Sequence, residues 1–329
     1  NTLWQGETRV LQTLTDIDVV GHRVVHGGQA YQTSTLITPE VKTEIARLHQ
    51  LAPNHNPANL AGIELMEELL EDVPQVAVFD TAFHSQIPDI AAIYPGPYSW
   101  VKQGIRRYGF HGISHQYCSQ RAAQILGREY LRLIVCHLGN GGSLCAVNRG
   151  RSIDTTMGFT PLDGLMMGTR SGAIDPGILV YLMRQGYNAD QLDLLLNKES
   201  GLKGISGISH DLRQIKQAID AGNSRAQLAR DIYLHRLKAH MGSMLMSLGG
   251  VDAVVFTAGI GEHDASIRAA VCKTMGFLGL TLDHDKNEKN PVDQDIATID
   301  STVRVLVIHT QEDWTIAQDC WRCLQENSQ

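Results

Sequence analysis

The chain has 329 residues, of which 43% are hydrophobic and 19% charged, and its formal net charge is −7. This length predicts two domains or one large domain with a sizeable buried core. A negative net charge offers no basic surface for the phosphates of a nucleic acid, and no apolar run approaches the ~20 residues that span a bilayer. We therefore expect a globular protein that binds neither nucleic acids nor membranes.

The cysteines and the N-terminal residues predict a reducing compartment. Six cysteines are scattered through the chain, which argues against a disulfide framework, and the first ten residues lack the basic and apolar segments of a secretory signal. Cys320 and Cys323 form a CxxC pair, but no second pair or histidine pair accompanies them, so we favour a structural role over a metal or redox site. These features predict a cytoplasmic protein.

Strand and helix patterns alternate along the chain. Near-continuous apolar and β-branched runs predict buried strands at residues 19–25, 76–80, 131–138, 143–148, 253–259 and 303–308. Thr38 and Asp175 each precede a proline and an apolar-periodic segment, which predicts two capped helices starting at Pro39 and Pro176. The alternation of buried strands with helices predicts an α/β architecture.

The longest predicted helix covers residues 224–248 and is expected to end at Gly249. Apolar residues at helical spacing predict that one face is buried, namely Leu228, Ile232, Leu237, Met241 and Leu245. We interpret the methionines of this helix, which include Met244 and Met246, as filler of the core or of a subunit interface.

Two glycine-rich turns follow apolar strands. Residues 135–148 read VCHLGNGGSLCAVN, and the backbone N–H groups of such a turn can cradle a phosphate because no Cβ blocks the approach. Residues 254–263 read VVFTAGIGEH, where a strand passes to a helix that we expect to begin near Glu262. Each turn alone could equally well be a phosphate-binding turn or a purely structural connection. The presence of both in one chain favours a nucleotide-binding site.

Three polar clusters interrupt apolar segments. GHRVVHGG places Arg23 at a strand end, VFDTAFH ends a buried strand with Asp80, and MGTRSGAIDP places Arg170 in a loop. One such residue is usually a surface or capping residue. Two arginines and an aspartate at the ends of apolar elements suit an anion whose charge grows during a reaction.

His111 and His115 lie four residues apart in RRYGFHGISH. This spacing can form a metal pair on a helix, but Gly112 and the lack of an accompanying glutamate weaken that interpretation. We expect Ser114 to cap the next helix, which leaves His111 in the preceding loop. His111 is therefore interpreted as a hydrogen-bond donor to a phosphoryl group in preference to a zinc ligand.

These motifs, in this order, resemble those of the acetate kinases, a family within the superfamily of acetate and sugar kinases and actin. The resemblance extends from about residue 18 to 319 and rests on HRVVHGG, LAPNHNPANL, VFDTAFH, RRYGFHGISH, HLGNGGS, DTTMGFTPLDGLMMGTRSG, KESGL and FTAGIGEH. It implies two ribonuclease-H-like domains with the active site in the cleft between them. The expected domains are residues 1–82 with 314–329, and residues 83–313, the latter binding nucleotide and forming a homodimer.

The resemblance also implies an activity and site residues. The reaction would be a reversible, Mg²⁺-dependent transfer of a phosphoryl group from ATP to acetate, giving ADP and acetyl phosphate; Mn²⁺ could replace Mg²⁺. The implied catalytic residues are Arg23, Asp80, His111 and Arg170, with Glu312 as the metal ligand. The implied carboxylate-binding residues are Arg23, Val25, Asn54, Phe110 and Pro161. The implied nucleotide-binding residues are His137, Leu138, Gly139, Asn140, Gly141, Gly142, Asp211, Leu212, Arg213, Gly259, Ile260, Gly261 and His263.

The sequence departs from the family pattern at several positions. Nothing before residue 18 matches the family's N-terminal phosphate loop, so we expect the first domain to be truncated at its N-terminus. Asn54 stands where the family usually has leucine, Ala173 where it has an acidic residue, and His263 and Gln311 where it has asparagine. Two alternatives therefore stand beside acetate kinase: a propionate or butyrate kinase, and a nucleotide-binding fragment with impaired catalysis.

Overall fold

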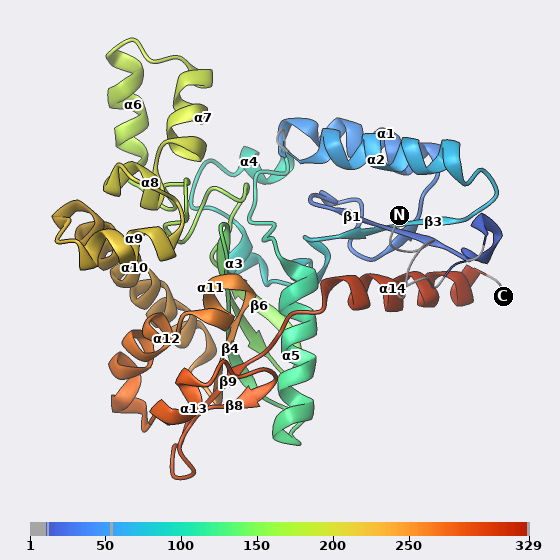
Figure 1. The fold of residues 1–329 in the computed structure, drawn as a ribbon. Helices are drawn as coiled ribbons and strands as arrows, with labels where there is room; N and C mark the ends of the chain where they lie inside the picture. Colours follow the sequence, from blue (N-terminus) through green and yellow to red (C-terminus); the bar gives the residue numbers. More distant parts are fainter. Residues whose placement is uncertain (1–10, 12, 53–54, 328–329) are drawn as a thin grey trace. The chain divides into compact units, whose positions relative to one another are not determined.

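The structure of the protein is a computed structural model that describes residues 11, 13–52 and 55–327. The described residues form two compact units (Figure 1). Unit 1 combines the segment up to Ser85 with the segment from Gln311, and unit 2 is Gln86–Thr310. Each unit has its own sheet, of three strands in unit 1 and six in unit 2.

The sheet of unit 1 has the strand order β1-β3-β2. β1 (Val20–Val24) and β3 (Gln75–Phe79) are parallel, and the short β2 (Thr35–Leu36) is antiparallel to β3. Every residue of β3 is buried, as expected of a central strand covered on both faces. The strands predicted at 19–25 and 76–80 are confirmed, whereas β2 is too short to show a periodic pattern.

Helices cover both faces of this sheet (Figure 1). α1 (Pro39–Arg47) and α2 (Asn56–Leu69) lie on one face, and α14 (Glu312–Asn327) lies on the other. The predicted cap of α1 is confirmed, since the Thr38 side chain accepts a hydrogen bond from the Val41 amide. The core of the unit contains Val24, Val41, Ile45, Ile63, Ala77 and Phe79. Single turns of 3-10 helix complete the unit: η1 (Leu14–Asp16), η2 (Leu48–Gln50) and η3 (Ala82–His84).

The sheet of unit 2 has the strand order β6-β5-β4-β7-β9-β8. Its three central strands β4, β7 and β9 are parallel, while β5, β6 and β8 are antiparallel to their neighbours. The strands are β4 (Arg132–Leu138), β5 (Gly142–Asn148), β6 (Arg151–Thr155), β7 (Ala253–Thr257), β8 (Gln294–Asp295) and β9 (Arg304–Val307). The four apolar strands predicted here are confirmed. β6 and β8 escaped prediction because they are edge strands with polar sequences.

Helices also flank the sheet of unit 2 (Figure 1). α5 packs on β4 and β7, and α10 packs on β4, β5 and β6. The helices are α3 (Asp89–Ala92), α4 (Ser99–Lys102), α5 (Gly112–Leu126), α6 (Pro176–Arg184), α7 (Ala189–Lys198), α8 (Gly201–Ser206), α9 (Leu212–Asp220), α10 (Ser224–Leu248), α11 (Ala258–His263), α12 (Ala265–Cys272), η4 (Lys273–Leu278) and α13 (His284–Glu288). The Asp175 cap of α6 is confirmed. Across the described part of the chain, no helix has both the length and the apolarity to traverse a bilayer.

The bounds predicted for α10 are confirmed, but its predicted buried face is partly wrong. Of the residues predicted for this face, Leu228 is exposed, whereas Leu237 and Met241 are buried. Of the other methionines interpreted as filler, Met244 is buried and Met246 is exposed. The helix contacts α8, α9, α12 and three strands along its 25 residues. Its buried surface therefore changes direction along the helix, and no single stripe describes it.

Two helices begin earlier than the sequence predicted. α5 begins at Gly112 with His111 as its N-cap residue, so Ser114 is not a cap and lies inside the first turn. α11 begins at Ala258, four residues before Glu262. His111 and Ala258 both have a positive φ, of 57° and 64°. In each case a left-handed residue turns the chain directly into a helix, a change that ordinary capping patterns do not reveal.

β1 and α14 approach each other closely at Gly21. A Cβ at Gly21 would lie 2.5 Å from Ile316 Cγ2 and 2.7 Å from Cys320 Sγ. Cys320 and Cys323 are both buried in α14 and neither forms a disulfide, in line with the structural role expected for them. The absence of a side chain at Gly21 thus allows the helix to cover the sheet.

We predict that Gly21→Ala lowers the free energy of unfolding by about 1–3 kcal/mol, the usual range for overpacking. The branched side chain of Ile316 has little rotameric freedom in a helix and cannot easily make room. Gly62→Ala is the matched control, because a Cβ there meets no atom within 4 Å and α2 should gain about 0.5–1 kcal/mol. Urea unfolding measures both changes, and equal effects of the two substitutions would contradict the close packing at Gly21.

Candidate active site

In unit 1, parallel pairing of β1 and β3 brings Arg23 and Asp80 together. Arg23 Nη2 lies 2.6 Å from Asp80 Oδ2, and Arg23 Nε donates to both carboxylate oxygens at 3.0 and 3.1 Å. The side chain of Asp80 is 2% exposed and that of Arg23 41%. Asp80 is therefore held inside the unit while part of the guanidinium remains accessible to a second anion.

Glu312 adds a second carboxylate to this cluster. Burial raises the pKa of Glu312, and the positive charge of Arg23 partly offsets that effect. Burial also opposes the charge on Arg23, but attraction and hydrogen bonding to Asp80, with a contribution from Glu312, raise the pKa of Arg23. Glu312 is therefore near enough to Arg23 for the two charges to interact.

The cluster of Arg23, Asp80 and Glu312 has hard oxygen donors that suit Mg²⁺ better than a soft metal. No three histidine, cysteine or acidic side chains gather as a metal cage anywhere among the described residues. A divalent cation would therefore take most of its ligands from water and substrate oxygens, which is how Mg²⁺ commonly binds.

The residues expected to form the carboxylate pocket are distributed over both units. Val25 follows β1 in unit 1, is buried, and its backbone N–H donates to Asn59 Oδ1 at 3.2 Å. Phe110 is buried in unit 2, and the Pro161 carbonyl accepts a hydrogen bond from Arg170 Nη1 at 3.3 Å. Asn54 lies outside the described residues.

In unit 2, His137 of β4 and Ser143 of β5 contact two further histidines, His111 and His115. His111 Nδ1 is 2.9 Å and His115 Nε2 is 2.8 Å from Ser143 Oγ. The rings of His111 and His137 stack with centroids 4.2 Å apart and planes 19° from parallel. The two histidines at i and i+4 thus share a serine hydroxyl.

The β4–β5 hairpin closes with the pair Leu138 and Gly142, and the Gly139 amide donates to the Gly141 carbonyl across the turn. A Cβ at Gly141 would lie 3.5 Å from Arg170 Nη1 and 3.7 Å from His111 Nε2. Arg170 and His111 therefore face the same point of the turn, where backbone groups are accessible because side chains are absent.

Arg170 is partly buried, and burial lowers its pKa. Within the described ranges, no acidic side chain is recorded as its ion-pair partner, and the guanidinium donates instead to the Pro161 carbonyl. A partly buried guanidinium without a carboxylate, beside a glycine turn, is a strong candidate for binding an anion.

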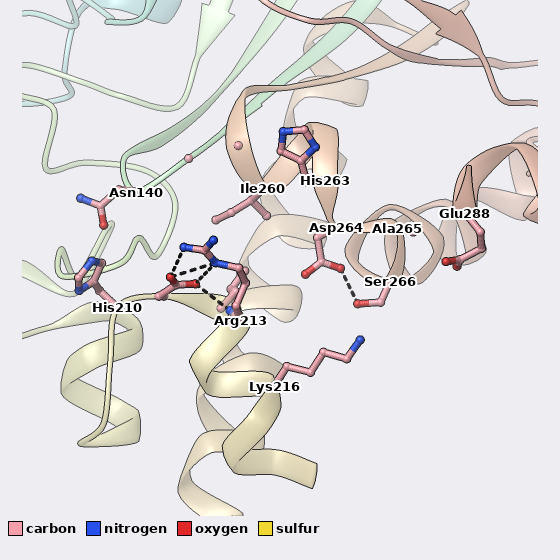
Figure 2. A pocket seen from close by; sticks show the side chains of 14 residues that line it. Asn140, His210, Arg213, Lys216, Ile260, His263, Asp264, Ala265, Ser266 and Glu288 are labelled. Atoms are coloured by element: carbon pink, nitrogen blue, oxygen red, sulfur yellow. Dashed lines mark hydrogen bonds and ion pairs between the residues drawn. The ribbon is translucent and has the colours of Figure 1, made fainter. Parts of the chain in front are cut away.

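The same turn borders a pocket of about 760 Å³ (Figure 2). This volume is in the usual range for a small-molecule site. Eight predicted nucleotide-binding residues line it: Gly139, Asn140, Asp211, Leu212, Arg213, Gly259, Ile260 and His263. The other five do not line it: His137, Leu138, Gly141, Gly142 and Gly261. Leu138 illustrates the reason, because its side chain points from the strand into the core.

The pocket also contains residues that the sequence analysis missed. They are His210, Lys216, Asp264, Ala265, Ser266 and Glu288 (Figure 2). Lys216 could have been found from its position one helical turn after Leu212 on α9. Glu288 ends α13, a short helix without a distinctive motif, so only the tertiary structure identifies it.

Asp211 orients Arg213 beside the pocket. Asp211 caps α9 by accepting a hydrogen bond from the Arg213 amide at 2.8 Å, and it also accepts from Arg213 Nε at 3.1 Å and Nη2 at 2.6 Å. These hydrogen bonds lower the pKa of Asp211. The guanidinium remains highly exposed, so its planar face can contact a ring bound in the pocket.

Glu262 stabilises the start of α11, the helix that contributes Gly259, Ile260 and His263 to the pocket. Its Oε1 accepts from the Ala258 amide at 2.8 Å, and its Oε2 lies 2.6 Å from His309 Nδ1. Ala258 has the positive φ that starts α11, so this buried carboxylate supports a strained turn. Sequence analysis treated Glu262 only as the start of a helix.

We predict that Arg23→Gln lowers the free energy of unfolding at pH 7 by about 3 kcal/mol, because it leaves a buried carboxylate without its cation. Burial raises the pKa of Asp80 and Arg23 opposes this shift. Without Arg23 the folded-state pKa rises further above the unfolded value. The loss of stability is therefore full above that pKa and shrinks as the pH falls through it.

Urea unfolding between pH 7 and pH 4.5 measures this pH dependence. Arg47→Gln is the control, because Arg47 pairs with Glu44 at the surface and should contribute at most about 1 kcal/mol. The role assigned to Arg23 and Asp80 would be contradicted if Arg23→Gln lost as little free energy of unfolding as the control. A loss that grows as the pH falls would contradict it too.

Comparison with known proteins agrees with these features. The acetokinase family profile matches residues 1–318. "Acetate kinase" of Acaryochloris marina is 72% identical over 97% of this chain and 80% of that protein, and the Nostoc punctiforme acetate kinase is 66% identical over 99% and 81%.

Solved structures give the same result. The crystal structure of Porphyromonas gingivalis acetate kinase has a TM-score of 0.91 at 44% identity, covering 98% of this chain and 82% of the other. A propionate kinase from Francisella tularensis has a TM-score of 0.89, also at 44% identity, covering 94% and 80%. The predicted α/β fold class, that of the acetate kinases and actin-like ATPases, is confirmed. The chain belongs to the acetokinase family.

Proposed function

We propose that this protein is an acetate kinase, which reversibly transfers the γ-phosphoryl group of ATP to acetate to give ADP and acetyl phosphate. One observation carries the proposal: the β4–β5 turn borders the 760 Å³ pocket through Gly139 and Asn140, while its next residue, Gly141, faces Arg170 and His111. A nucleotide in the pocket would thus have its phosphates beside two hydrogen-bond donors. Relatives called acetate kinases, 60–72% identical, support this assignment.

The chemistry needs few catalytic groups. A carboxylate oxygen of acetate is already nucleophilic, so catalysis consists mainly of aligning the reactants and stabilising charge on the equatorial oxygens of the transferring group. Arg170 and His111 are proposed to donate hydrogen bonds to those oxygens. Arg23, oriented by Asp80, is proposed to bind the carboxylate through its accessible part.

Mg²⁺, or Mn²⁺ in its place, is the proposed metal. Glu312 would hold it, largely through water, and the bound ion would neutralise negative charge on the phosphates. The assignment rests on the oxygen donors of Glu312 and Asp80 around Arg23, and on the general need of phosphoryl transfer for a cation.

We assign the nucleotide to unit 2 and the carboxylate and metal groups chiefly to unit 1. Arg213 and Ile260, which face the pocket from α9 and α11, would contact the adenine ring with a planar cation and an apolar surface (Figure 2). The expected domains, residues 1–82 with 314–329 and residues 83–313, give the same division except at Glu312, which belongs to unit 1 in the structure.

A homodimer in the cytoplasm is the proposed form of the protein. α6 has the sequence PGILVYLMR, yet none of its residues is buried. Ile178, Val180, Tyr181 and Met183 are each more than 40% exposed. An apolar helix surface of this kind suits a subunit contact.

A propionate kinase is the second candidate, because the Francisella tularensis propionate kinase is as similar to this chain as the acetate kinase of Porphyromonas gingivalis in sequence identity. One methylene in a pocket changes specificity by only about 1–3 kcal/mol, so close relatives can differ in their preferred acid. A nucleotide-binding fragment with impaired catalysis is the third candidate.

Steady-state assays of the purified protein with ATP, Mg²⁺ and acetate, propionate or butyrate test these candidates. We expect acetyl phosphate to form and kcat/KM to be highest for acetate. A higher value for propionate or butyrate would reassign the substrate. Nucleotide binding without turnover of any of the three acids would contradict the kinase assignment and favour the impaired fragment.

We predict that Arg170→Ala lowers kcat by about 100-fold or more, since it removes a donor that acts on developing charge. The KM for ATP should stay within a few-fold, because the pocket is unchanged. Arg151→Ala, at the exposed start of β6, is the control and should retain full activity. A variant at Arg170 that loses ATP affinity but keeps kcat would show that Arg170 binds nucleotide and does not act in the transfer.

A further inference from the structure

A buried serine hydroxyl joins two histidines behind the β4–β5 hairpin. Ser143 on β5 and His115 on α5 are both fully buried. Ser143 Oγ lies 2.8 Å from His115 Nε2 and 2.9 Å from His111 Nδ1. The other ring nitrogen of His111, Nε2, is the one that faces Gly141. The two nitrogens of His111 thus have different tasks, one toward Ser143 and one toward the glycine turn.

The hydrogen positions on Ser143, His111 and His115 depend on one another, because each of these groups has a single hydrogen to donate. A serine hydroxyl donates one hydrogen bond, and a neutral imidazole has a single N–H. If His115 Nε2 donates to Ser143, the hydroxyl donates to His111 Nδ1, and the hydrogen of His111 is on Nε2. If the direction is reversed, His111 Nδ1 donates and Nε2 presents a lone pair to the turn. In both arrangements the hydroxyl hydrogen points to one of the two rings, and the tautomer of His111 is then linked to that of His115 through Ser143.

The surroundings of His111 disfavour a doubly protonated ring. The ring of His137 stacks on it at 4.2 Å, and Arg170, which keeps its charge, faces the same point at Gly141. Positive charge on His111 would repel the guanidinium. A neutral ring donates through only one nitrogen, so the tautomer decides whether His111 can donate toward the turn.

We propose that His115 and Ser143 are positioning residues that keep the hydrogen of His111 on Nε2. Phosphoryl oxygens carry negative charge and no hydrogen, so they require a donor at this nitrogen. In the proposed arrangement His115 Nε2–H donates to Ser143 Oγ, and Ser143 Oγ–H donates to His111 Nδ1. The choice of tautomer and the identity of the acceptor as a phosphoryl group both rest on the proposed function, whereas the hydrogen-bonded link through Ser143 does not.

Nitrogen-15 NMR of the full chain with labelled histidine tests the tautomer directly, because protonated and unprotonated ring nitrogens have well-separated shifts. His111→Gln identifies the His111 signals by their loss. In the wild type we expect a protonated Nε2 and an unprotonated, hydrogen-bonded Nδ1 for His111. Ser143→Ala should convert this pattern into a mixture of tautomers. A wild-type hydrogen on Nδ1, or an unchanged pattern in Ser143→Ala, would overturn the proposal.

Kinetics supply a second test. Ser143→Ala should lower kcat by about 10- to 100-fold, the range for outer hydrogen-bond partners that orient a functional histidine. The KM for ATP should change little. His115→Gln places an amide donor near the position of the ring Nε2 and should retain more activity than His115→Leu. Equal losses in these two His115 variants would mean that His115 only fills space.

Ser152→Ala is the matched control for Ser143→Ala. Ser152 is also fully buried in the same sheet, on β6, with its hydroxyl 3.2 Å from Cys145 Sγ. It should keep the wild-type kcat and the wild-type His111 signals. The same loss of kcat in both serine variants would indicate a general effect on the sheet and overturn the proposal.

Different results would contradict the proposed function and the proposed roles of Ser143 and His115. A wild-type protein that lacks acetate-dependent turnover but shows the expected His111 tautomer would refute the proposed function alone. Full activity with the hydrogen on Nδ1 would refute only the inference about Ser143 and His115. Because the wild-type spectrum and His115→Gln do not depend on how well Ser143→Ala folds, both outcomes can be observed.

Discussion

The turn between β4 and β5 has to carry almost no side-chain volume, because groups approach its backbone from two directions. Gly139 and Asn140 border the pocket, whereas Gly141 faces a guanidinium and an imidazole. The tightest position is Gly139, where a Cβ would lie 3.2 Å from the Gly141 carbonyl oxygen. Parallel pairing of β4 with β7 brings the start of α11 to the same end of the sheet, so both glycine-containing segments meet at one pocket.

Within each unit the structure separates charges by how deeply they are buried. Asp80 in unit 1 is buried and bonded to Arg23 through two guanidinium nitrogens, which leaves part of that arginine accessible. Arg170 in unit 2 is partly buried and bonds to a carbonyl. The first arginine is thus held in position by a carboxylate, and the second keeps its charge for an incoming anion. This difference fits the separate tasks proposed for the two arginines, binding a carboxylate and stabilising a phosphoryl group.

Much of the fold could be predicted because buried strands and capped helices have local causes. The apolar runs of β3, β4 and β7 and the caps at Thr38 and Asp175 all appear where the sequence indicated. Two of the errors occur where the backbone turns in a way that no local pattern encodes. His111 and Ala258 start helices from left-handed conformations that other parts of the unit stabilise, such as Glu262 beside Ala258.

The sequence by itself determined the α/β class, the family, and which residue types carry the chemistry, because these depend on motifs that are contiguous in the chain. Only the tertiary structure decided the partners: Asp80 for Arg23, Ser143 for both His111 and His115, and Glu288 and Lys216 in the pocket. Ser143 lies 32 residues from His111 and Asp80 lies 57 from Arg23. Hydrogen bonds act over about 3 Å, so such pairs exist only once strand pairing and helix packing have brought distant segments together.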